Sequence, residues 1–198
     1  AYGWQARKEG QPFFCVYNTT TSHESKAHGV AGQLKNNPDK MTLFSYHPDL
    51  PVIRQNYAKY ADAVERMDGD VARCIAQLKK DGLYEDTIII YNSDHGGVMA
   101  RSKRFLYSSG VHCPLIVRIP RKYKHLYPAD KPGSTVDRLV SFVDMPKTWL
   151  GLAGAEIPDT FQGRIFLGEG TEAEPKYHLG FRERADERLD HVRLMRDK

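Results

Sequence analysis

The sequence has no long hydrophobic run, little cysteine and little net charge. No apolar stretch approaches the roughly 20 residues of a membrane-spanning helix, so we expect no membrane span. The three cysteines, Cys15, Cys74 and Cys113, are an odd set without metal-type spacing, which argues against a disulfide framework and predicts buried thiols. The formal net charge of +4 is too small to indicate a nucleic-acid partner, and we expect none.

The composition is otherwise that of an ordinary globular domain. With 198 residues, 40% of them hydrophobic and 27% charged, the chain is long enough for one domain with a substantial core. It begins at Ala1, within a structural pattern and without a methionine. We therefore expect it to be a fragment of a longer protein, so that the missing export signal says nothing about location.

The most informative stretch begins at residue 87. Residues 87–91 and 115–119 are β-branched, apolar runs that predict strands buried on both faces. The first run ends in a polar, glycine-containing loop with Asp94 beside His95. Ligands bind beyond the carboxyl ends of strands in open α/β sheets, and these two side-chain types can hold a divalent metal. The alternative is an Asx-turn that closes the strand, followed by a solvated basic loop.

Other segments extend this pattern. Residues 13–17 predict another buried strand, which is followed by a polar loop containing His23. Helical periodicity over residues 51–80 and 136–152 predicts two helices. Helix, turn and buried strand in succession favour a parallel sheet.

Two charged segments have a simpler interpretation. The acidic residues of the 51–80 helix are scattered around its axis, which favours a solvated face over a metal cluster; they are Asp62, Glu65, Asp68 and Asp70. The basic and aromatic residues 121–132 fit a connecting loop better than a nucleic-acid patch, because prolines and a glycine interrupt them.

Several strings together resemble the second half of the formylglycine-dependent sulfatases of the alkaline phosphatase superfamily. They are YNSDHG at 91–96, SK at 102–103, LYSSG at 106–110, PLIVR at 114–118 and VSFVDMP at 140–146. The ordered set is similar in particular to bacterial carbohydrate sulfatases that resemble heparan N-sulfatases. Ser-Asp-His-Gly alone is less specific, because phosphatases and phosphomutases of the superfamily also use it.

The resemblance implies an α/β fold, with an alkaline-phosphatase-like, mostly parallel sheet flanked by helices. Residues 1–168 would be the C-terminal part of the catalytic domain. Residues 169–198, with runs at 177–181 and 191–197 that predict two strands, would begin a small antiparallel C-terminal subdomain. The resemblance alone favours a periplasmic or secreted location.

The resemblance also implies roles for residues near the strand ends. His23 matches a histidine that hydrogen-bonds the sulfate ester. Lys103, four residues before Tyr107, matches a lysine that contacts the sulfate, with Arg104 as the competing candidate. Asp94 and His95 match two metal ligands.

A further role falls on the C-terminal strands. An arginine between the two runs, Arg184 or Arg188, would reach over an anionic sugar. A charged hairpin tip without such a role is the alternative.

The expected cofactors are a divalent metal and a formylglycine. Calcium is common in the family, whereas a histidine at position 95 also suits manganese or zinc. No cysteine of the chain lies in a Cys-x-Pro-x-Arg setting, so the formylglycine is expected in a missing N-terminal part. The implied function is hydrolysis of a sulfuric ester or sulfamate on a sulfated carbohydrate, with the fragment alone inactive. The alternatives are a phosphatase or phosphonate hydrolase, and a non-catalytic module that binds sulfated glycans.

Overall fold

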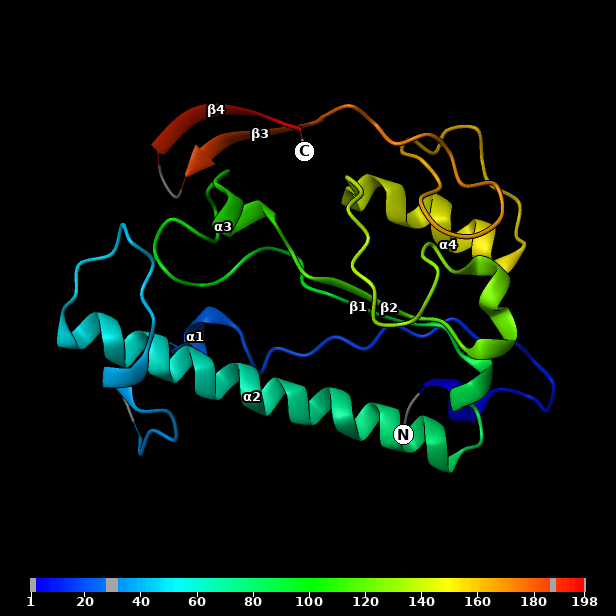
Figure 1. Cartoon of the computed structure of the whole chain (residues 1–198), viewed down its shortest axis with the longest axis horizontal. Coiled ribbons are helices and arrows are strands. Elements are labelled where there is room, and N and C mark those ends of the chain that lie inside the picture. The colour runs from blue at the N-terminus through cyan, green and yellow to red at the C-terminus, as the bar shows by residue number, and fades with distance from the viewer. Residues whose placement is uncertain (1–2, 28–31, 186–187, 198) are drawn as a thin grey trace. The chain divides into compact units, whose positions relative to one another are not determined.

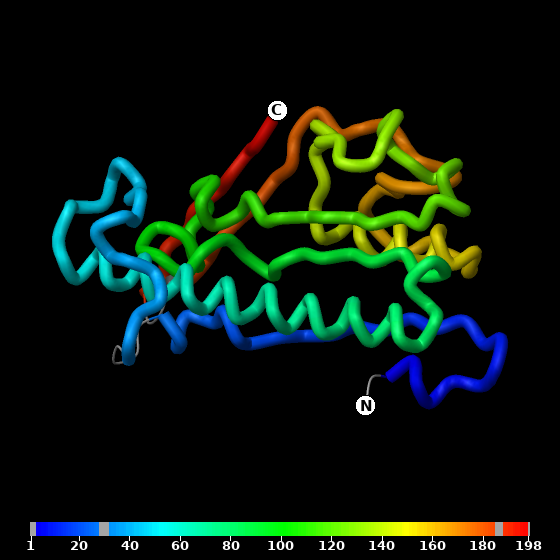
Figure 2. The backbone as a smooth tube through the Cα atoms, turned by 60° about the horizontal axis from the view of Figure 1, so that its bottom comes forward, coloured from blue at the N-terminus to red at the C-terminus, as the bar shows by residue number. Residues whose placement is uncertain are grey.

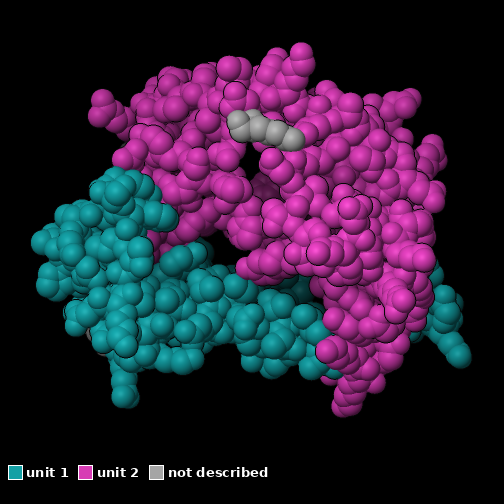
Figure 3. All heavy atoms as spheres, in the orientation of Figure 1, with its two compact units in different colours: residues 1–76 teal, residues 77–198 magenta. Residues whose placement is uncertain are grey.

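The computed structural model describes residues 3–27, 32–185 and 188–197, and the chain divides into two compact units, residues 1–76 and 77–198 (Figure 3). The α-helices are α1 (Glu24–Ala27), α2 (Pro51–Lys80), α3 (Ser108–Val111) and α4 (Met145–Ala153). The strands are β1 (Ile89–Asn92), β2 (Leu115–Arg118), β3 (His178–Ala185) and β4 (Arg188–Arg196). Short 3-10 helices span Gly3–Ala6, Pro38–Lys40, Tyr84–Asp86, Arg121–Leu126 and Phe142–Asp144. Within the described ranges, no helix has the length and apolarity needed to cross a bilayer.

The long helix α2 confirms the prediction for residues 51–80 (Figure 1). Pro51 occupies its first position, where the missing backbone N–H costs no hydrogen bond. Just past its end Gly82 has a φ of 70°, a left-handed conformation that suits glycine and ends a helix. Ala58 and Ala63 are fully buried on α2.

Side chains of α2 hold the irregular segments of the first unit. The buried Asp62 carboxylate accepts the backbone N–H groups of Lys35, at 3.0 Å, and Asn36, at 2.9 Å. The Asp70 carboxylate accepts the hydroxyl groups of Thr19, at 2.9 Å, and Thr21, at 2.6 Å. The prediction of a solvated acidic face is therefore wrong for Asp62 and Asp70, because both carboxylates fasten loops to the helix.

The predicted strand at residues 13–17 is also wrong. The segment has no strand structure, and the side chains of Phe14 and Val16 are 76% and 66% exposed. A strand requires a neighbour for its backbone N–H and C=O groups, and the described residues of this unit contain no other strand. An apolar run signals a preference for burial but does not supply a partner.

The described residues of the second unit form two strand pairs, both antiparallel. β1 pairs with β2 from Ile89 opposite Arg118 to Asn92 opposite Leu115, so the two runs lie side by side (Figure 2). The prediction of two strands at these positions is confirmed, but the predicted burial on both faces is wrong, because the Ile116 side chain of β2 is 62% exposed. The mostly parallel sheet is not formed by the described strands, because the apolar pattern of a strand does not encode the direction of its partner.

The predictions of a C-terminal strand pair and of a second long helix have different outcomes. β3 and β4 form the hairpin expected near the C-terminus, with Leu179 opposite Met195. The helix expected over residues 136–152 begins later, because the buried Asp144 carboxylate accepts the backbone N–H of Ser141 at 2.8 Å and starts the helical path there. The same carboxylate accepts the Arg164 N–H at 2.9 Å and so fixes the irregular segment after α4.

Candidate functional site

Asp94 and His95 are the second and third residues after the end of β1, in the loop beyond the strand, as predicted. The Ser93 hydroxyl donates to the backbone carbonyl of His95 at 2.7 Å and tightens this loop. The Asp94 side chain is 90% exposed and the His95 side chain 29% exposed. The carboxylate is therefore open to a ligand, while the imidazole is partly enclosed.

The hydrogen bond of His95 determines which ring nitrogen is available. Its Nδ1 lies 2.6 Å from the backbone carbonyl oxygen of Gly96. Because a carbonyl only accepts, a neutral ring carries its proton on Nδ1 and keeps the lone pair on Nε2. Nε2 lies 3.8 Å from Oδ1 of Asp94.

The Asp94 carboxylate and the His95 Nε2 are spaced as two ligands of one cation would be. With metal–ligand bonds of about 2.1–2.5 Å, neighbouring ligands of one ion lie roughly 3–4 Å apart. A histidine that ligates through one nitrogen and donates its other N–H to a carbonyl is the usual arrangement in metal sites. No cluster of three His, Cys, Asp or Glu side chains exists within the described ranges, so this part of the chain offers Asp94 and His95 as a pair of donors.

Two glycines join this loop to the segment that follows. The Gly96 N–H donates to the Gly110 carbonyl at 2.8 Å. A Cβ atom on Gly96 would lie 1.9 Å from the backbone oxygen of Ser109, and one on Gly110 would lie 2.2 Å from the oxygens of Ser102 and Phe105. Only glycine permits this approach of backbone to backbone.

Lys103 belongs to the same loop assembly. Its backbone N–H donates to the Gly97 carbonyl at 2.9 Å, and the Phe105 N–H closes a turn onto the Ser102 carbonyl at 3.0 Å. The Lys103 side chain is half-buried. Backbone hydrogen bonds thus connect the Lys103 turn to the loop that carries Asp94 and His95.

The cysteines do not follow the prediction of three buried thiols. All three are free, and Cys15 is exposed because it lies in the segment that forms no strand. Cys113 is half-buried; burial raises the pKa of its thiol, a hydrogen bond with Ser93 opposes the rise, and the Asp94 charge adds to it. Burial likewise raises the pKa of Cys74. Cys113 therefore remains a neutral thiol beside the Asp94 loop.

His23 lies in the first unit, in the residue before α1. The Ser25 N–H donates to its Nδ1 at 3.3 Å, so a neutral ring carries its proton on Nε2 and offers that N–H as a donor. Asp94, His95 and Lys103 belong to the second unit. That all four share one pocket stays a prediction.

Arg184 and Arg188 lie at the exposed tip end of the β3–β4 hairpin. The sequence reasoning missed Arg182, which contacts the Lys103 turn: its Nη1 donates to the Arg104 carbonyl at 2.5 Å. No local signal distinguishes Arg182 from its neighbours, because its direction depends on the register of the hairpin.

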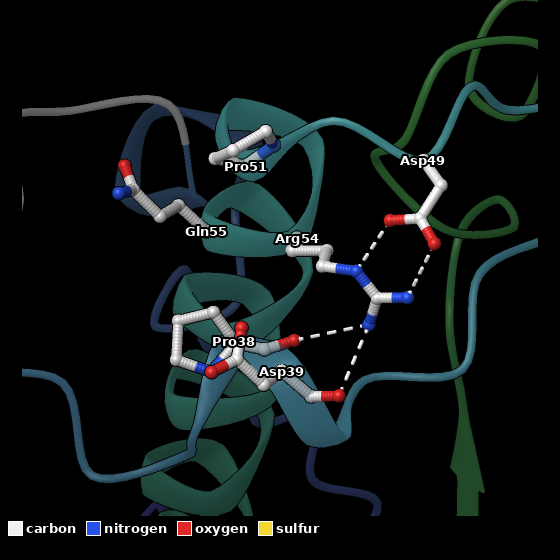
Figure 4. Close-up of a pocket in the computed structure, with 6 residues that line it drawn as sticks. All are labelled: Pro38, Asp39, Asp49, Pro51, Arg54 and Gln55. Atoms are coloured by element: carbon white, nitrogen blue, oxygen red, sulfur yellow. Dashed lines mark hydrogen bonds and ion pairs between the residues drawn. The ribbon is translucent and has the colours of Figure 1, made fainter.

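A cavity of about 530 Å³ lies in the first unit (Figure 4) and is lined by Pro38, Asp39, Asp49, Pro51, Arg54 and Gln55. Arg54 forms two bonds to Asp49, with Nη2 2.7 Å from Oδ2, and its Nη1 donates to backbone carbonyls, including that of Met41 at 3.0 Å. The bond to Arg54 lowers the pKa of Asp49. This guanidinium is committed to the loop before α2 and serves structure.

Comparison with known proteins identifies the family. The Sulfatase family model matches residues 1–155, more than half of the chain, and the chain belongs to this family. The chain is 31% identical, over 98% of its length, to an ulvan-active sulfatase of Formosa agariphila. It is 35% identical, over 55% of its length, to an N-acetylglucosamine-6-O-sulfatase of Bacteroides thetaiotaomicron. The family prediction is confirmed.

A solved structure is also similar. A phosphonate monoester hydrolase from Silicibacter pomeroyi superposes with a TM-score of 0.56 and 30% identity, covering 74% of this chain and 29% of that protein. The chain spans 38% of the length of the ulvan-active sulfatase and 19% of that of the N-acetylglucosamine-6-O-sulfatase.

Proposed function

We propose that the protein hydrolyses a sulfuric ester or sulfamate on a sulfated carbohydrate. The observation that carries the proposal is the Sulfatase match over residues 1–155, and the carbohydrate class is supported by relatives named for ulvan and N-acetylglucosamine. In this proposal residues 1–168 belong to a catalytic domain of alkaline-phosphatase-like fold. Residues 169–198 begin an antiparallel subdomain, in keeping with the β3–β4 hairpin.

Asp94 and His95 would hold a divalent metal, with calcium favoured and manganese or zinc as alternatives. The exposed carboxylate, the free Nε2 and their 3.8 Å separation support this assignment. Such an ion supplies Lewis-acid stabilisation of the sulfate oxygens when bound.

Lys103 and His23 would contact the sulfate. An ammonium fixed on a hydrogen-bonded turn offsets negative charge that develops as the S–O bond breaks. The Nε2–H of His23 is a donor of the right kind for an ester oxygen. Arg184 and Arg188 would lie over an anionic sugar.

The nucleophile is proposed to come from residues outside this chain. None of Cys15, Cys74 and Cys113 lies in a Cys-x-Pro-x-Arg setting, where the family forms formylglycine. We therefore expect the 198-residue chain alone to be inactive.

The test compares ester classes in the full-length protein. Equal concentrations of 4-nitrophenyl sulfate, 4-nitrophenyl phosphate and a 4-nitrophenyl phosphonate are assayed for release of nitrophenol. The largest kcat/KM for the sulfate supports the proposal.

A second candidate, phosphonate or phosphate ester hydrolysis, is favoured by the similar Silicibacter pomeroyi structure. A larger kcat/KM for the phosphonate or phosphate would establish it. Binding of a sulfated oligosaccharide without turnover of any ester would instead indicate a non-catalytic binding module.

A further inference from the structure

The turn that carries Lys103 is held in an unfavourable backbone conformation. Lys103 and Arg104 are the two central residues of the turn that Ser102 and Phe105 close at 3.0 Å. Arg104 has a φ of 72°, a left-handed conformation that turns usually assign to glycine or asparagine. A non-glycine residue there costs on the order of 1–3 kcal/mol and persists only when its surroundings impose it.

Arg182 supplies such a restraint from β3. Its Nη1 donates to the Arg104 carbonyl at 2.5 Å, and its guanidinium lies 4.7 Å from the centre of the Phe105 ring. It therefore contacts the backbone of the strained residue and the side chain of the next residue at once.

The guanidinium is itself fixed in place. Arg182 forms an ion pair with Asp190 on β4, and its side chain is only 13% exposed. Asp190 neutralises the charge of Arg182, which removes it as a competing site for a sulfate. A second bond between hairpin and loop, from Arg196 Nη1 to the Ser108 hydroxyl at 2.9 Å, lies beyond the turn.

We propose that Arg182 is the positioning residue of Lys103: it holds Arg104 in the left-handed conformation and thereby fixes the direction of the Lys103 side chain. This inference rests on the proposed function, in which Lys103 contacts the sulfate. The β3–β4 hairpin would thus position a residue that contacts the sulfate, a role separate from the sugar contact predicted for Arg184 and Arg188. Without Arg182, the turn relaxes toward a negative φ at Arg104. The Lys103 ammonium then moves away from the position at which it would contact the sulfate.

The first test is the turnover of 4-nitrophenyl sulfate by the full-length protein. We expect Arg182→Ala to lower kcat roughly 10- to 100-fold, as displacement of a charge-stabilising group by about 1 Å does, with a smaller change in KM. Arg193→Ala is the matched control on the same hairpin, since the Arg193 guanidinium lies 5.6 Å from the centre of the Phe181 ring and donates to the Val192 carbonyl at 3.2 Å. It should keep kcat within about twofold, as surface substitutions generally do.

A second substitution that restores kcat would distinguish a positioning role of Arg182 from a general loss of structure in Arg182→Ala. Asparagine adopts a left-handed conformation readily, so Arg104→Asn should remove the need for the restraint. We expect Arg182→Ala/Arg104→Asn to recover most of the kcat lost in Arg182→Ala. Failure to recover, or a loss in Arg104→Asn alone as large as in Lys103→Ala, overturns the proposal.

Amide hydrogen exchange supplies a measurement that does not depend on turnover. Arg182→Ala should speed exchange in peptides covering residues 101–110, whereas Arg193→Ala should not. If the wild-type protein turns over no sulfate ester, the proposed function fails while faster exchange still supports the restraint. Unchanged exchange together with unchanged kcat in Arg182→Ala refutes the inference even in an active sulfatase.

Discussion

The Asp62 carboxylate accepts both the backbone N–H and the side-chain amide of Asn36, at 2.9 and 2.7 Å from Oδ1. Its other oxygen accepts the Lys35 N–H at 3.0 Å. One buried side chain of α2 therefore satisfies three donors of a segment that has no regular structure.

Replacing this carboxylate should destabilise the first unit. We expect Asp62→Ala to lower the free energy of unfolding by about 2–4 kcal/mol, because three charge-assisted hydrogen bonds in a partly buried setting are lost. Urea unfolding followed by circular dichroism measures the change. Asp68→Ala, an exposed position on the same helix, is the control and should change stability by less than about 0.5 kcal/mol.

The Asp62 carboxylate should also make the free energy of unfolding depend on pH. Burial acts to raise the pKa of Asp62, but hydrogen bonds from Asn36 and Lys35 outweigh it and hold the pKa below its ordinary 3.8. A lowered folded-state pKa stabilises the protein above the unfolded value, and that stability is lost as pH falls through the folded value. The difference in unfolding free energy between wild type and Asp62→Asn should therefore be constant near neutrality and shrink below about pH 4. A difference that does not vary between pH 7 and pH 3 contradicts this account.

Metal binding should depend on Asp94. We expect Asp94→Ala to weaken calcium binding to the full-length protein at least tenfold, because an exposed carboxylate is the harder of the two proposed donors. Isothermal titration with calcium, after chelation, measures the affinity. Asp130→Ala provides the control, being an exposed aspartate in a loop of the same unit. Equal affinity in the two variants would remove Asp94 from the proposed site.

The contact between the two glycines should tolerate no side chain. Gly96→Ala places a Cβ 1.9 Å from the Ser109 oxygen, so the backbone must separate and the Gly96–Gly110 hydrogen bond must break. We expect lost sulfate turnover and a lower melting temperature. Gly69→Ala is the matched control: it lies inside α2 with its nearest neighbour at 3.6 Å, and alanine there should stabilise the helix by about 0.5–1 kcal/mol. A stable and active Gly96→Ala protein would show that the close approach is dispensable.

Local patterns predicted α2, β1 and β2, but they failed for the strand expected at residues 13–17 and for the start of the helix expected over residues 136–152. The periodicity of residues 51–80 gave α2 at its observed bounds, and the apolar runs gave β1 and β2 within two residues. The ordered sulfatase strings gave the family, and the position of Asp94 and His95 beyond a strand followed from the same run.

Features that depend on which segments of the chain pack against each other were not predictable from the sequence. The direction of β2 relative to β1 and the exposure of Phe14 follow from which segments meet, and a single segment does not encode that. Asp62 is acidic and surface-like in sequence but is buried, because its donors lie on a distant loop. Arg182 required the hairpin register, which brings Asp190 and the Arg104 carbonyl within its reach.

The loop that carries Asp94, His95 and Lys103 is assembled main chain to main chain. Its cross-links run from the Gly96 N–H to one carbonyl and from the Lys103 N–H to another. Because these cross-links use backbone atoms alone, they do not depend on the identity of the side chains that flank them. If the protein hydrolyses sulfate esters as proposed, exchanges of the flanking side chains would change which esters fit and leave this main-chain frame in place.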